Sequence, residues 1–307
     1  MTAAEKTAED IKSMKIRGAG RIARASAAAM GDFAENYTGG SLEDFRKEAG
    51  KNAEILIASR PTAVSLWNGV KASMKGLEDA SDLNEAKELV RRNSEAFVKA
   101  SSEAVDRIAK IGAKRIESGD VVMTHCNSSA ALGVIKEAHR QGKEFEVYAT
   151  ESRPWRQGIL TVRELAAEGI PVTIIIDSAV RTVMKKTDKV FVGADTITSH
   201  GALVNKIGTS QLALAAHEAR VQFYVCSETY KFSPATIFGD LVTIEERDTG
   251  EVVRDGEIPD SVKIFNPVFD STPAAYIDAI ITEVGVIHPG SVYEIMVGQL
   301  GRNIFGE

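Results

Sequence analysis

Hydrophobic positions in the first third of the chain recur at helical spacing. Residues 1 to about 115 are dominated by Ala, Glu, Lys and Arg, and Leu, Ile and Val return every three or four positions, as in Ser41–Ser59 and Leu83–Ile111. Pro61 and Gly76 interrupt this pattern and divide it into separate helices. The pattern predicts an α-helical N-terminal domain over residues 1–115.

The pattern changes at Gly119, where short apolar runs begin to alternate with helical stretches. The runs that predict strands lie at 121–124, 145–150, 172–176, 189–194 and 222–226. Strands that alternate with helices form βαβ units, and these build a parallel sheet with right-handed crossovers. The predicted fold class is α/β, with the N-terminal α-helical domain followed by a Rossmann-like parallel-sheet domain over residues 116–307.

The last part of the sequence adds an excursion, a strand and a helix to this second domain. Residues 241–264 are more charged and contain D-T-G and R-D-G turns, which predict a hairpin-like excursion. A further strand is expected at Ala279–Ile281, and a last helix near Val292–Leu300.

Composition and charge narrow the function classes. The chain has 307 residues, of which 44% are hydrophobic and 26% charged, as in soluble globular proteins. A formal net charge of −6 argues against general nucleic-acid binding. We expect neither a secretory signal nor a membrane span, and the two cysteines, Cys126 and Cys226, have no metal-ligand spacing. We therefore expect a reduced, cytoplasmic protein with no metal, no membrane partner and no nucleic-acid partner.

Polar residues follow the predicted strands, and Cys126 follows the first. In a doubly wound sheet, ligands bind at the carboxyl ends of the strands. Ser128 or Ser129 can cap the next helix, whose N-terminus would favour a thiolate nearby. The alternative is that Cys126 is a small buried hydrophobic residue, as most lone cysteines are.

Acidic and basic residues follow the other predicted strands. Arg153 comes after the second run, Asp177 after the third, Asp195 after the fourth and Lys231 soon after the fifth. Asp177 can equally be a helix cap. Asp195 precedes T-I-T-S-H-G, which has no helical pattern, so a cap is less natural there, although a structural loop role stays open.

Three basic segments are candidate anion sites. Asn205 and Lys206 lead through a glycine into a helix, where backbone N–H groups and one fixed charge can hold a phosphate, although an ordinary capped helix also fits. Arg17, Gly18, Ala19 and Gly20 form a glycine-containing turn inside an otherwise helical region, and Arg60 precedes Pro61. Separate anion sites around one thiol and one carboxylate indicate a small phosphorylated substrate.

An ordered set of motifs carries a family resemblance. The motifs are R-G-A-G at 17–20, R-P-T-A-V-S-L at 60–66, T-H-C-N-S at 124–128, E-S-R-P at 151–154, G-A-D-T-I at 193–197, N-K-I-G-T at 205–209 and E-T-Y-K-F at 228–232. Between about residues 10 and 290 the chain resembles the archaeal ribose-1,5-bisphosphate isomerases. These belong to a superfamily with the methylthioribose-1-phosphate isomerases and the regulatory α, β and δ subunits of initiation factor two B.

The resemblance implies an intramolecular oxidoreductase that converts α-D-ribose 1,5-bisphosphate into D-ribulose 1,5-bisphosphate in archaeal AMP and nucleoside degradation. It implies Cys126 and Asp195 as the catalytic acid–base pair and no cofactor. The substrate-binding residues that it implies, with Ser128 and Arg153 added from the strand ends, are Arg17, Gly18, Ala19, Gly20, Arg60, Ser128, Arg153, Asn205, Lys206 and Lys231.

The resemblance also implies a homo-oligomer built from dimers, with the bisphosphate isomerases forming hexamers. Two other functions stay open. A methylthioribose-1-phosphate isomerase would share Cys126 and Asp195 but would need a single phosphate site, whereas the cationic set here favours two. A regulatory translation subunit would need neither catalytic residue.

Overall fold

The computed structural model describes residues 1–300, and the chain divides into two compact units. One unit is Met1–Ala104, and the other begins at Val105. The division falls inside helix α5 (Leu83–Gly112), ahead of the boundary expected at residue 115, which stays a prediction.

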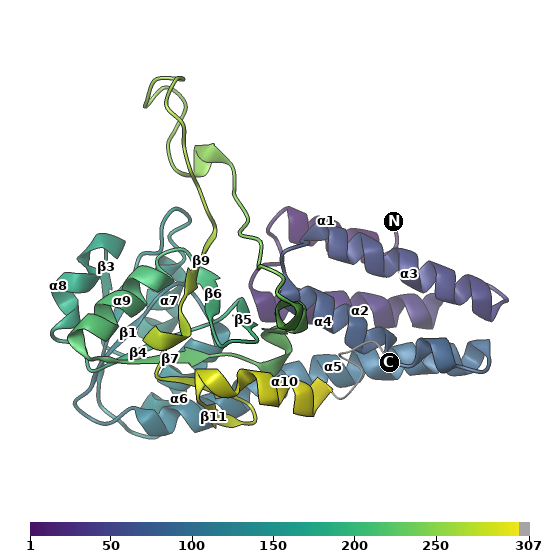
Figure 1. Ribbon diagram of the computed structural model, residues 1–307, viewed down its shortest axis with the longest axis horizontal. Coiled ribbons are helices and arrows are strands. Elements are labelled where there is room, and N and C mark those ends of the chain that lie inside the picture. Colours follow the sequence, from purple (N-terminus) through teal and green to yellow (C-terminus); the bar gives the residue numbers. More distant parts are fainter. Residues whose placement is uncertain (301–307) are drawn as a thin grey trace. The chain divides into compact units, whose positions relative to one another are not determined.

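The N-terminal unit consists of helices packed around one apolar core (Figure 1). Besides α5, its helices are α1 (Ala3–Lys12), α2 (Ala19–Asn36), α3 (Leu42–Ser59), α4 (Val64–Met74) and the short η1 (Leu77–Asp79). Ile22 of α2 and Phe45 and Leu56 of α3 are fully buried in the core. The amphipathic spacing in the sequence produces this arrangement, because each helix buries one stripe of apolar side chains.

The second unit contains a seven-stranded sheet within the described residues, in the order β11-β10-β7-β4-β1-β2-β3. Its strands are β1 (Val121–Thr124), β2 (Glu146–Thr150), β3 (Val172–Ile175), β4 (Lys189–Val192), β7 (Gln222–Cys226), β10 (Ala279–Thr282) and β11 (Gly285–Ile287). All neighbours pair in parallel except β10 with the edge strand β11. Counted along the chain, the parallel strands have the Rossmann order 3-2-1-4-5-6. The predicted α/β fold class is confirmed.

Helices cover both faces of this sheet, and successive strand residues alternate between them. Val190 and Val192 of β4 pack in a core with α8 (Val180–Met184), α9 (Thr209–Ala219) and α10 (Val292–Leu300), whereas Phe191 packs on the other face. That other core includes α6 (Ser129–Arg140) and α7 (Gly158–Ala167). Burial on both faces explains why the central strands β1, β4 and β7 appear in the sequence as continuous apolar runs.

The sequence did not predict the second, smaller sheet of this unit. It has the order β8-β5-β6-β9, with β5 (Thr196–Thr198), β6 (Leu203–Lys206), β8 (Phe232–Ser233) and β9 (Phe269–Thr272). These strands are only two to four residues long, too short to show a period-two pattern.

The charged segment 241–264 is an extended excursion, drawn in light green and yellow-green in Figure 1. Its base is paired like a hairpin, because the Arg247 N–H donates to the Asn266 carbonyl and the Val268 N–H donates to the Glu245 carbonyl. Of the helices in residues 1–300, none is long and apolar enough to cross a membrane.

Candidate active site

Cys126 and Asp195 follow neighbouring strands of the large sheet. Cys126 lies two residues beyond β1, and Asp195 lies three residues beyond β4. The chain leaves β1 toward β2 on one side and reaches β4 on the other, so the strand order reverses between them. Open α/β sheets bind ligands at the carboxyl ends of the strands at such a point. The fold therefore brings the two predicted catalytic residues to the edge where a ligand is expected.

The Cys126 residue is held in an unusual backbone conformation. Its φ angle is +67°, in the left-handed region, which costs a residue with a Cβ about 1–2 kcal/mol. Its N–H donates to Ser152 Oγ at 2.8 Å, and its carbonyl oxygen accepts from Thr161 Oγ1 at 2.6 Å. Its Sγ donates to Gln157 Oε1 at 3.3 Å. Strained residues held by several contacts often occur at functional sites.

The pKa of the Cys126 thiol is raised to about 11, mainly by burial and in smaller part by the charges of Asp195 and Asp177, against the opposing charge of Lys206 and a backbone hydrogen bond. Ser128 does cap α6, with its Oγ accepting from the Ala131 N–H at 3.4 Å. The favourable effect of this helix end on a thiolate stays a prediction. In the ligand-free protein, loss of hydration outweighs the charge of Lys206 and favours the neutral thiol.

His125, directly before the cysteine, is buried and fully bonded. Its Nδ1 lies 2.6 Å from Thr150 Oγ1, and its Nε2 lies 2.9 Å from the Ile207 carbonyl oxygen. Burial lowers the pKa of His125, so the neutral ring prevails, and the contact to a carbonyl requires a proton on Nε2. This histidine ties the end of β1 to the turn that follows β6.

The small sheet brings Asn205, Lys206 and Lys231 close to Asp195. Strands β5 and β6 form an antiparallel pair in which the Asp195 N–H donates to the Val204 carbonyl at 3.1 Å. Asp195 therefore lies beside Asn205 and Lys206, which end β6. Lys231 directly precedes β8, which pairs with β5. Residues that are distant in sequence thus meet next to Asp195.

At the start of α9, where the sequence predicts a phosphate site, two of the N–H groups are bonded to a carboxylate. The Gly208 N–H donates to Asp270 Oδ2 at 2.7 Å, and the Ser210 N–H donates to both carboxylate oxygens at 3.1 Å. Asp270 arrives there because β9 pairs with β6 and places it opposite Asn205. The side chain of Lys206 lies over the ring of Phe269, with 5.2 Å between Nζ and the ring centroid.

Lys231 and Arg153 each have an interaction within the same unit. Lys231 is buried, and its Nζ lies 2.7 Å from Glu228 Oε2, so its positive charge is paired with a buried carboxylate. Arg153 is exposed and donates from its side chain to the Val252 carbonyl at 3.1 Å. Ser128 lies against Gly193, where a Cβ would collide with the serine side chain. Glycine at 193 therefore permits the close approach of the two strand ends.

The predicted residues of the N-terminal unit also lie near one another. Gly18, with φ +90°, precedes α2, which begins at Ala19, and Arg17 comes just before. The Ser65 hydroxyl donates to the Ala19 carbonyl at 3.0 Å, so the turn that carries Arg60 lies beside the start of α2. The unit thus presents a basic, glycine-containing helix start.

Sequence reasoning missed Gln157, Thr161 and Ser152, which contact Cys126. Gln157 comes three residues after the E-S-R-P motif, and this closeness was the only signal for it. Thr161 lies inside a helical pattern and gives no sign of its contact.

The fold and the arrangement at its strand ends define a Rossmann-like α/β protein with a helical N-terminal unit. The sequence model of the Initiation factor 2 subunit family matches residues 15–289, so the chain belongs to that family. The ribose 1,5-bisphosphate isomerase of Archaeoglobus fulgidus is 53% identical over 294 residues, which are 96% of this chain and 92% of that protein. The protein of that name from Methanocaldococcus jannaschii is 50% identical over 97% of this chain and 95% of its own.

Solved structures of related proteins have the same fold as this chain. One titled translation initiation factor eIF-2B, from Pyrococcus horikoshii, has a TM-score of 0.81 and 33% identity, covering 93% of this chain and 97% of its own. The 5-methylthioribose 1-phosphate isomerase of the same organism has a TM-score of 0.77 and 31% identity, covering 97% and 88%. These comparisons confirm the expected family and the expected enzyme class, the sugar-phosphate isomerases.

Proposed function

We propose that this protein converts α-D-ribose 1,5-bisphosphate into D-ribulose 1,5-bisphosphate in the degradation of AMP and nucleosides. The main support is the high identity, along nearly the whole chain, to relatives named for this substrate. The positions of Cys126 and Asp195 at neighbouring strand ends are consistent with it.

The proposed chemistry moves two protons. Asp195 protonates the ring oxygen as the C1–O4 bond breaks, and it later takes the proton of the C2 hydroxyl. Cys126, as the thiolate, takes the proton from C2 and returns it to C1, which leaves a ketone at C2. Acid–base groups held in place contribute about 10²–10⁴-fold each. Because the resting thiol has a raised pKa, this route requires Cys126 to lose its proton during turnover.

We assign the substrate phosphates to the predicted substrate-binding residues. In the second unit these are Asn205, Lys206 and Lys231, with Ser128 and Arg153 at the ends of β1 and β2. In the N-terminal unit they are Arg17 to Gly20 and Arg60. Fixed cations and backbone N–H groups are the usual partners of phosphate oxygens.

We also propose a homo-oligomer built from dimers, which light scattering on the purified protein tests.

The decisive experiment is a coupled assay with α-ribose 1,5-bisphosphate, in which RuBisCO detects the product. Methylthioribose 1-phosphate is run in parallel, because one solved neighbour is an isomerase of that substrate. Turnover of the bisphosphate alone supports the proposal, and turnover of methylthioribose 1-phosphate alone replaces it. If folded protein converts neither, the proposal fails, and binding to translation initiation factor two becomes the next measurement.

A further inference from the structure

Helix α7 provides two of the hydrogen bonds that hold the turn carrying Cys126. Gln157, at the N-terminal end of this helix, and Thr161, one turn further on, both form hydrogen bonds with Cys126. Residues four apart share one face of a helix, so a single helix position fixes both contacts. Gly158 sets that position, because a Cβ there would collide with the Thr150 carbonyl oxygen at the end of β2.

Thr161 makes the contact that restrains the backbone. Its side chain is fully buried, and its hydroxyl donates to the Cys126 carbonyl oxygen at 2.6 Å while accepting from Asn127 Nδ2 at 3.1 Å. One hydroxyl thus bonds to two successive residues of the turn. Together with the Ser152 contact to the Cys126 N–H, it holds both peptide groups of a left-handed residue.

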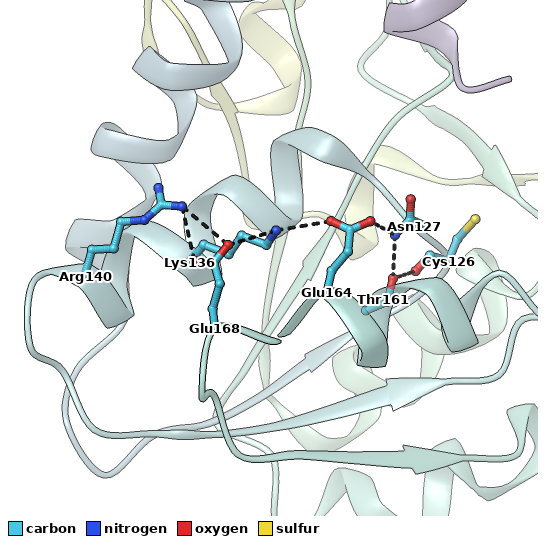
Figure 2. A network of polar contacts seen from close by, with 7 residues as sticks. All are labelled: Cys126, Asn127, Lys136, Arg140, Thr161, Glu164 and Glu168. Atoms are coloured by element: carbon cyan, nitrogen blue, oxygen red, sulfur yellow. Dashed lines mark hydrogen bonds and ion pairs between the residues drawn. The ribbon is translucent and has the colours of Figure 1, made fainter. Parts of the chain in front are cut away.

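Polar contacts continue from this point outward between α6 and α7, as Figure 2 shows. Asn127 Nδ2 also donates to Glu164 Oε1 at 3.1 Å, and Lys136 bridges Glu164 and Glu168 at 3.1 Å each. Arg140 contacts Glu168 at 3.1 Å. The Lys136 side chain is 18% exposed, so α6 and α7 are joined by ion pairs whose cation is largely shielded from solvent.

We propose that Thr161 is a positioning residue that fixes the Cys126 peptide, and through it the thiol, for the reaction. The network from Asn127 to Lys136 keeps α7 in register with the turn. This inference rests on the proposed function where turnover is the readout, but the reactivity of the Cys126 thiol tests it without any substrate.

The test compares Thr161→Val, which removes the hydroxyl at nearly constant volume, with Thr161→Ser, which keeps it. Thr187→Val is the matched control, because Thr187 is another buried threonine that bonds to a helix carbonyl, away from the site. We expect kcat of Thr161→Val to fall about tenfold or more with little change in KM, since displacements near 1 Å can cost about 100-fold. Thr161→Ser and Thr187→Val should stay near the wild-type value.

Iodoacetamide alkylation of Cys126, followed by mass spectrometry of the intact ligand-free protein, is the second readout. The rate should change about threefold or more in Thr161→Val and not in Thr187→Val. If Thr161→Val does not fold, Asn127→Ala at a half-buried position takes its place, with the same expectation.

Three results would overturn the proposal. A folded variant with wild-type kcat and wild-type alkylation shows that the hydroxyl does not position the thiol. An equal loss in Thr161→Ser assigns the effect to packing, and a loss confined to KM assigns Thr161 to substrate binding. Absence of isomerase activity in the wild-type protein refutes the proposed function alone, because the alkylation rates still decide the role of Thr161.

Discussion

The thiol of Cys126 donates a hydrogen bond to the side-chain oxygen of Gln157, with 3.3 Å between sulfur and oxygen. A thiolate has no proton to donate, so this contact belongs to the neutral thiol. Burial, which raises the pKa of Cys126 to about 11, favours the same form. The resting site therefore holds a protonated thiol, and the base proposed for the reaction is a minor species near neutral pH.

Alkylation of Cys126 should consequently be slow at pH 7 and speed up steeply with pH. Because the thiolate is the nucleophile, the rate should rise about tenfold per pH unit while the pH stays below the pKa. The measurement is the iodoacetamide rate between pH 7 and 10, with Cys126→Ser as the blank for Cys226. A rate that levels off below pH 9 would contradict the raised pKa.

Removing either proposed catalytic group should abolish most of the turnover. We expect Cys126→Ser and Asp195→Asn each to lower kcat by about 10²–10⁴-fold, the usual contribution of one acid–base group. Circular dichroism should show unchanged folding, since both side chains lie only partly buried at strand ends. Undiminished turnover in Cys126→Ser would end the proposed mechanism.

Lys206 should act through substrate affinity. Lys206→Met removes a cation at the end of β6, and a lost charge-assisted hydrogen bond of about 1.5–3 kcal/mol corresponds to a rise in KM of about 10- to 100-fold. Lys185→Met, at an exposed position after α8, is the control that should leave KM unchanged. Equal KM values for the two variants would remove Lys206 from the phosphate site. Lys231 is less suitable for this test, because its loss would leave the buried Glu228 unpaired and reduce stability.

The main sheet could be predicted from the sequence because its central strands are buried on both faces. Val121–Thr124 and Lys189–Val192 are short apolar runs bounded by polar residues, and their ends point directly to Cys126 and Asp195. The switch point follows from the strand order, which the alternation of strands and helices does not by itself determine.

The details around the thiol could not be derived in this way. Thr161 and Gln157 reach Cys126 only because Gly158 lets α7 pack closely on β2, a contact with no periodic signature. Asp270 reaches the start of α9 through the pairing of two short strands more than 60 residues apart in sequence. Tertiary pairing, rather than local propensity, determines these contacts.

Asp270 should make the stability of the protein depend on pH in an unusual direction. Burial raises the pKa of this carboxyl from 3.8 to about 6, although the N–H groups of Gly208 and Ser210 oppose the shift. Between these two values the folded protein binds more protons at Asp270 than the unfolded chain does. The contribution of Asp270 to the free energy of unfolding therefore falls as pH rises through this window, by at most on the order of 3 kcal/mol.

Asp270→Asn should remove this contribution, because an amide does not ionise and still offers one oxygen to the N–H groups of α9. We expect the Tm difference between variant and wild type to shift in favour of the variant as pH rises from 4 to 7. Asp260→Asn, at an exposed position, should run parallel to the wild type. Thermal unfolding followed by circular dichroism at each pH is the measurement. If the Asp270→Asn and wild-type curves were parallel, Asp270 would have an ordinary pKa and would cap α9 as a carboxylate throughout this range.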